Sequence, residues 1–213
     1  MTTDNPSCVG PVPQDMLEIL MNGIFAFAMT LIVKNNIPLP SGEIVGNIGL
    51  LVEFFLTVLF DGISFIFTFI LLAVFYILSF EIMRNVRSVD RITVYTVFAF
   101  LLSILFIPLT SLIWAISDEP VPYGMFFHTN ILLCGLILFF LWTYACQTPE
   151  IIRKDSSAEY VKNLSSRIIV FPITALAGII IDGSNISFAA IPIMFLYLFP
   201  ILFCVRYANR IYN

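Results

Sequence analysis

Few residues in this chain could carry acid–base or nucleophilic chemistry. The chain has one histidine, His128, near the outer end of an apolar run, and no Ser-His-Asp set, HExxH pattern or glycine-rich phosphate loop. We interpret His128 as a membrane-interface residue, with a proton relay as the alternative. Paired acids for general acid–base catalysis are not evident inside any apolar run. We therefore expect that the chain is not an enzyme.

The cysteines show no spacing that indicates a metal site or a redox motif. Cys134 and Cys146 lie about 18 Å apart along one predicted helix, which is too far for a disulfide. We interpret them, with Cys8 and Cys204, as small apolar residues in lipid or helix interfaces. Neither a metal nor a cofactor is predicted.

The most patterned stretch of the chain covers residues 22–33. Small residues at positions 23, 26 and 28 would let helices pack closely. Phe27, Leu31 and Lys34 recur at i, i+4 and i+7, so they share one helix face. A ring of such faces around a symmetry axis would form a hydrophobic constriction, which can gate a pore by dewetting. A stripe of this kind by itself is also typical of helix–helix packing.

Composition determines what kind of elements must position this stretch. Of the 213 residues, 60% are hydrophobic and only 11% are charged, whereas a soluble domain carries about 25% charged residues. Most of the chain must therefore contact lipid. The net charge of −4 argues against a nucleic-acid partner, which would require basic patches.

We predict an all-α integral membrane protein with six transmembrane helices. The expected spans are runs of roughly 20 apolar residues, at 16–33, 62–80, 92–116, 124–146, 168–181 and 186–205. They form one domain over residues 16–210, after an N-terminal segment of residues 1–15. Residues 44–60 are expected to form an interfacial or re-entrant helix, because Glu53, Asp61 and Gly62 interrupt the long apolar run.

The basic residues predict the orientation of these spans. Nine of the ten follow the second, fourth or sixth predicted span, in three regions that would share one side of the membrane: Arg84, Arg87, Arg91, Arg153, Lys154, Lys162, Arg167, Arg206 and Arg210. The positive-inside rule places this side, and with it both termini, in the cytoplasm. Three acids lie near predicted span ends and are expected to be solvated at the interface: Glu53, Asp61 and Glu81.

The stretch at 22–33, followed by Pro38, resembles the first span of the transmembrane-protein-175 potassium channels. Residues 64–91 look like that family's second span and basic turn, and residues 106–111 look like its third span. The likeness covers about residues 16–210 and is most specific in the first span. It implies the fold of the six-span prokaryotic members, which are homotetramers with the first helix around a central pore.

The resemblance also implies roles for particular residues. Phe27 and Leu31 would form the pore constriction, and the hydroxyl of Thr30 would lie between them. The remaining expected pore-lining positions are Asn22, Gly23 and Lys34. The implied permeant species is K⁺ or another monovalent cation, and the implied location is the plasma membrane of a prokaryote.

The chain departs from this family at the start of the first span. The family's Arg-x-x-x-Phe-Ser-Asp motif is here Met16-x-x-x-Leu20-Met21-Asn22, so its polar members are replaced. A different support for the first span is therefore expected. The leading hypothesis is a potassium-conducting channel. The alternative is a divergent, non-conducting homologue that acts as a small-solute transporter or a membrane interaction protein.

Overall fold

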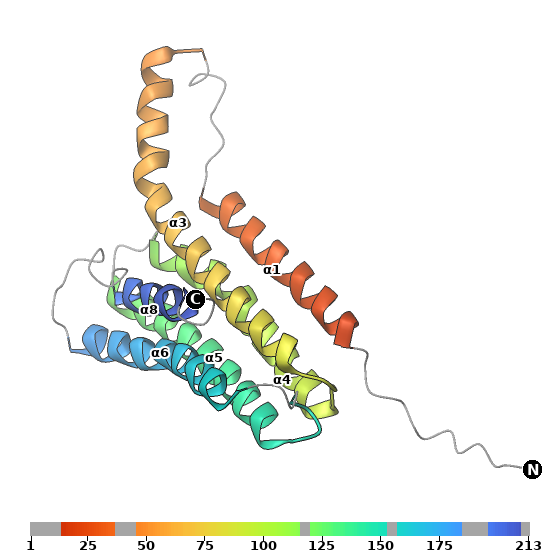
Figure 1. Cartoon of the computed structure of the whole chain (residues 1–213). Helices are drawn as coiled ribbons and strands as arrows, with labels where there is room; N and C mark the ends of the chain where they lie inside the picture. Colours follow the sequence, from red (N-terminus) through yellow and green to blue (C-terminus); the bar gives the residue numbers. More distant parts are fainter. Residues whose placement is uncertain (1–13, 37–45, 116–119, 153–156, 185–195, 210–213) are drawn as a thin grey trace, which may run out of the picture.

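The computed structural model describes residues 14–36, 46–115, 120–152, 157–184 and 196–209 (Figure 1). These ranges are helical apart from short turns and one isolated bridge. The helices are α1 (Gln14–Asn36), α3 (Ile48–Asn85), α4 (Arg91–Ala115), α5 (Pro120–Gln147), α6 (Ala158–Gly183) and α8 (Leu198–Asn209). The predicted all-α class is confirmed for the described part of the chain.

Five of the described helices are long and apolar enough to cross a membrane: α1, α3, α4, α5 and α6. α8 contributes a shorter apolar stretch, Leu198–Tyr207. The predicted sixth span, 186–205, overlaps α8 only in part, because residues 185–195 lie outside the described residues. Most of the predicted N-terminal segment, residues 1–13, lies outside them too.

The structure differs from the sequence prediction between residues 48 and 85. Residues 48–60 and 62–80, which were expected in separate segments, belong to one continuous helix, α3, and residues 44 and 45 lie outside the described residues. The reason is that Ile48–Asn85 contains no proline. A single glycine such as Gly62 costs a helix only about 1 kcal/mol, and a charged side chain breaks no backbone hydrogen bond. In Figure 1 the N-terminal part of α3 stands away from the other helices.

α6 also begins earlier than the predicted span at 168–181. Its first helical residue is Ala158, because the side chain of Ser157 caps the helix by accepting a hydrogen bond from the Tyr160 amide at 3.2 Å. Basic residues at positions 162 and 167 therefore lie within the helix rather than in a loop. These two residues precede the apolar run of α6, but the helix itself begins before them.

The helices pack in a simple order, in which α5 lies between α4 and α6 while α1 lies against α3 and α4 (Figure 1). The contact between α5 and α6 is close at Gly135. A Cβ atom at this position would lie 2.6 Å from Cδ of Pro172, which is inside α6. The glycine is therefore needed for the two helices to approach.

The loops that follow α3 and α5 are joined to each other at one end of the bundle. Val86 and Ile152 form an isolated antiparallel bridge, and the Arg87 amide donates to the Ile151 carbonyl at 2.6 Å. At the start of α1, the Gln14 side chain donates to the Met83 carbonyl at the end of α3 at 2.8 Å. The start of α1 therefore lies at the same end as the loops that follow α3 and α5.

Candidate functional site

One face of α1 is buried against other helices of the chain, and the opposite face is exposed. Its buried residues recur at helical spacing and pack against the core: Leu17, Met21, Phe25, Ala28 and Ile32. The opposite face is exposed and carries Met16, Ile19, Asn22, Gly23, Ala26, Phe27 and Thr30. This exposed face carries apolar or small residues over most of its length, so in a membrane it can contact lipid or another copy of the chain.

Most of the predicted pore positions lie on this exposed face. Phe27 is 58% exposed, and a Cβ atom placed on Gly23 would meet no atom within 4 Å. Leu31 is half-buried at the border between the two faces. The backbone of Lys34 belongs to α1, but its side chain lies outside the described residues. The structure therefore places Phe27, Gly23 and Thr30 together.

The first half of α1 is supported by an aromatic residue of α3. The Tyr76 hydroxyl donates to Oδ1 of Asn22 at 3.1 Å, and the Tyr76 ring makes an edge contact with Phe25, with 5.3 Å between centroids. One turn before Asn22, Glu18 accepts a hydrogen bond from Gln14 at 2.9 Å. The contacts of Tyr76 with Asn22 and Phe25 attach α1 to α3 in the region where the family's Arg-x-x-x-Phe-Ser-Asp motif is replaced.

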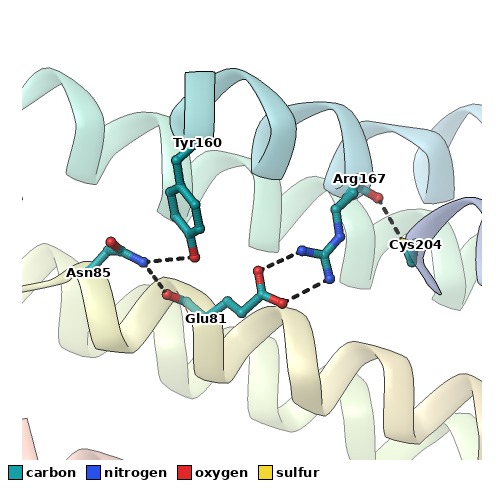
Figure 2. Close-up of polar contacts among 5 residues, drawn as sticks. All are labelled: Glu81, Asn85, Tyr160, Arg167 and Cys204. Atoms are coloured by element: carbon teal, nitrogen blue, oxygen red, sulfur yellow. Dashed lines mark hydrogen bonds and ion pairs between the residues drawn. The ribbon is translucent and has the colours of Figure 1, made fainter. Parts of the chain in front are cut away.

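An ion pair that sequence reasoning missed joins α3 to α6 (Figure 2). Both terminal nitrogens of Arg167 donate to the Glu81 carboxylate, at 2.6 and 2.9 Å. Only 3% of the Arg167 side chain and 14% of the Glu81 side chain are exposed. The expectation that Glu81 is solvated at the interface is therefore wrong. Arg167 itself could have indicated this pair, because a charged residue next to an apolar run is expected to pair with an opposite charge.

Further polar contacts extend this ion pair on both sides. The Asn85 side chain donates to the Tyr160 hydroxyl at 3.1 Å and to the Glu81 carbonyl at 2.7 Å. On the other side, the Cys204 thiol of α8 lies 3.6 Å from the Arg167 carbonyl (Figure 2). The network thus connects α3, α6 and α8 near the C-terminal end of α3.

His128 lies in a second polar cluster, which the sequence analysis also missed. It is fully buried, so its interpretation as an interface residue is wrong. Nδ1 lies 2.7 Å from the Tyr197 hydroxyl, and Nε2 lies 3.5 Å from a carboxylate oxygen of Asp182 in α6. A Cβ atom on Gly178 would lie 2.7 Å from the ring, so this glycine makes room for the imidazole. The proton-relay alternative stays untested.

Asp90 fixes the start of α4 by accepting two hydrogen bonds. Its carboxylate accepts a hydrogen bond from the Thr93 amide at 2.8 Å and another from the Tyr144 hydroxyl of α5. Burial tends to raise the pKa of Asp90, but hydrogen bonds from Thr93 and Tyr144 outweigh it and hold the pKa below its ordinary value. The residue therefore both caps α4 and ties it to α5.

The other residues singled out in the sequence are the cysteines and the acids Glu53 and Asp61. Within the described part of the chain, no group of three or more potential ligands could hold a metal ion. Cys134, Cys146 and Cys204 are free thiols, whereas Cys8 lies outside the described residues. Glu53 is exposed, and the side chain of Asp61 lies outside the described residues.

The chain is similar to known potassium channels. Residues 16–108 match the sequence model of a family described as endosomal/lysosomal potassium channel TMEM175. Among solved structures, the chain is similar to the crystal structure of a lysosomal potassium-selective channel TMEM175 homolog from Chamaesiphon minutus. The TM-score is 0.69 at 18% sequence identity, over 92% of this chain and 97% of that chain. No curated protein matches the sequence. The matched family is one of channels and not of enzymes, in agreement with the sequence analysis.

Proposed function

We infer the function of this chain from the premise that it is related to the TMEM175 potassium channel family, which its first span resembles. It is a multi-pass membrane protein with the fold of a prokaryotic homologue. We propose that it forms a cation channel that conducts K⁺. In this proposal four copies surround a central pore lined by α1, both termini are cytoplasmic, and the membrane is the plasma membrane of a prokaryote.

The exposed face of α1 is the observation that carries the proposal. A helix at the centre of a symmetric assembly must leave one face uncovered in the single chain, and α1 does so at Asn22, Gly23, Phe27 and Thr30. Phe27 would form the main constriction, with Leu31 one turn further along the helix. Gly23 and Ala26 are small enough for neighbouring copies to approach each other closely.

Thr30 adds a polar layer that suits a cation. Its hydroxyl donates to the Ala26 carbonyl at 2.7 Å, so its proton is used within α1. A hydroxyl oxygen has two acceptor lone pairs, and these remain available on the exposed face. A ring of such oxygens would favour a cation or its hydrating water over an anion. Asn22 and Lys34 complete the proposed pore-lining set.

The test is cation flux through the reconstituted protein. Wild type should pass K⁺, and Phe27→Ala should raise the flux because a smaller side chain widens the constriction and eases its wetting. Phe98→Ala is the matched control, since Phe98 on α4 is similarly exposed, at 51%, but lies outside the proposed pore. The proposal fails if neither wild type nor Phe27→Ala conducts any cation.

The second candidate is a homologue that no longer conducts and that transports a small solute or serves as a membrane interaction protein. The observation that favours it is the replacement of the family's polar motif by Met16, Leu20, Met21 and Asn22. A particle with four-fold symmetry and α1 at its axis would favour the channel. A monomer with saturable, substrate-dependent flux would favour the transporter.

A further inference from the structure

Asn22 is a polar residue on the exposed face of α1 that is bound by a side chain of another helix. It lies at the edge of this face next to α3, where the Tyr76 hydroxyl donates a hydrogen bond to Oδ1 at 3.1 Å. Phe27 follows five residues later, about 7.5 Å further along the helix. Asn22 therefore lies between the start of α1 and the proposed constriction, and Tyr76 contacts it directly.

The position of the Tyr76 hydroxyl is itself fixed by two other aromatic rings. Phe25 of α1 makes an edge contact with the Tyr76 ring at 5.3 Å between centroids, and Phe80 of α3 stacks on it at 6.2 Å between centroids. A phenol oxygen is rigidly attached to the end of its ring, so contacts that hold the ring also hold the hydroxyl. Tyr76 thus presents a donor to Asn22 from a fixed place.

This hydrogen bond determines which atom of Asn22 faces away from α3. A side-chain amide has an oxygen that accepts hydrogen bonds and an NH₂ group that donates them, and the two point in different directions from Cγ. Because Oδ1 is directed at Tyr76, the NH₂ group is the part that is left at the exposed surface. Among the described residues, the hydrogen bond from Tyr76 is the only one made by the Asn22 side chain.

We propose that Tyr76 is a positioning residue of the pore, which acts through Asn22 by turning the amide NH₂ groups toward the ion path. This inference rests on the proposed function, since it requires α1 at the centre of the assembly. N–H groups solvate anions and oxygen atoms solvate cations, so four NH₂ groups in one layer would lower the preference of that layer for K⁺ over Cl⁻. Weak binding there would help a cation to leave, as conduction requires.

The test is the K⁺/Cl⁻ permeability ratio of the reconstituted full-length protein, taken from the reversal potential in a KCl gradient. One hydrogen bond biases two orientations about fivefold. Without it, the share of oxygens that face the ions should rise from about one sixth to about one half. Tyr76→Phe should therefore raise the ratio about threefold. A purely structural role of Tyr76 would change the size of the current without raising this ratio.

The matched control for this change is Tyr95→Phe, which should leave the ratio unchanged. Tyr95 is a tyrosine on α4 that is 72% exposed and lies outside the proposed pore, so the variant loses the same hydroxyl without touching Asn22. Asp15 and Glu18, the acids near the start of α1, are present in every variant. Their attraction for cations therefore contributes equally to all of the ratios that are compared.

Two variants of Asn22 show whether Tyr76 acts through it. In the background of Asn22→Ala, Tyr76→Phe should leave the ratio unchanged, because no amide remains to turn. Asn22→Asp should raise the ratio while Tyr76 is in place, because a carboxylate can accept from the Tyr76 hydroxyl with one oxygen and face the ions with the other. This second variant keeps the contact with α3, so it does not depend on how well Tyr76→Phe folds.

The possible failures are distinguishable. A conducting Tyr76→Phe protein with an unchanged ratio would overturn this inference and leave the channel proposal intact. The same holds for an unchanged ratio in Asn22→Asp, and for a rise by Tyr76→Phe that is equally large in the Asn22→Ala background. If neither wild type nor Phe27→Ala passes any ion, the proposed function fails, and this inference fails with it.

Discussion

The Glu81–Arg167 ion pair allows a prediction in which the two partners behave differently with pH. Arg167 cannot lose its proton in a protein, whereas a carboxylate can be neutralised. Glu81→Gln therefore leaves an unpaired positive charge on Arg167. This charge is buried, because the Arg167 side chain is only 3% exposed. Loss of one partner of a buried pair typically costs about 3–5 kcal/mol of stability. This loss should be the same at pH 7 and pH 5.

Arg167→Met strands the carboxylate instead, and here the cost has a ceiling set by protonation. Neutralising a carboxyl of ordinary acidity costs about 3.7 kcal/mol at pH 7 and about 1 kcal/mol at pH 5. The destabilisation by Arg167→Met should therefore shrink as the pH falls. The double variant Glu81→Leu with Arg167→Met buries no charge, so it should recover most of the wild-type stability.

The assay is the free energy of unfolding in mixed micelles, measured against wild type at each pH. Arg206→Met is the matched control, since Arg206 is an exposed arginine on α8 and its removal should change little. Two results would refute the reasoning. One is an Arg167→Met defect that is equally large at pH 7 and pH 5, and the other is a double variant as unstable as either single variant.

Two further predictions follow from the other polar contacts. Gly178→Ala should lower the free energy of unfolding by about 1–3 kcal/mol, because the added methyl group would overlap the His128 ring, whereas Gly183→Ala has open space and should be near neutral in the same measurement. The lowered pKa of Asp90 stabilises the fold above the ordinary aspartate pKa of about 3.9, and this contribution is lost as the pH falls through the folded value. The melting temperature of wild type should therefore fall more steeply than that of Asp90→Asn below about pH 4, and parallel curves would contradict this assignment.

The helix class and several of the span positions were accessible from the sequence because lipid imposes a simple rule on composition. Runs of about 20 apolar residues are long enough to cross a membrane, and α1, α4 and α5 lie within a few residues of the predicted spans. The continuity of α3 was not accessible in the same way. Charged residues and a glycine suggested a break at residues 61–62, but helix continuity depends on backbone hydrogen bonds, which those side chains leave intact.

The polar clusters were missed for a different reason. Glu81 and Arg167 are 86 residues apart, and His128 and Tyr197 are 69 residues apart. Each residue looked like an isolated polar group near a span end, because the sequence does not say which helices are neighbours. Within α1 the residue spacing did separate two faces, so the pattern around Phe27 could be interpreted without knowing the partner helices. What that face contacts remains the subject of the proposal.

The bridge between Val86 and Ile152 has a consequence for how the chain is made. Because the chain is synthesised from its N-terminus, the loop between α3 and α4 is made before its partners, Ile151 and Ile152. During that interval the Arg87 amide has no Ile151 carbonyl to bind. An unpaired amide costs little where water can bind it, whereas the same open backbone inside the hydrocarbon would be costly. Closure of this bridge therefore requires that the end of α5 lies beside the loop between α3 and α4.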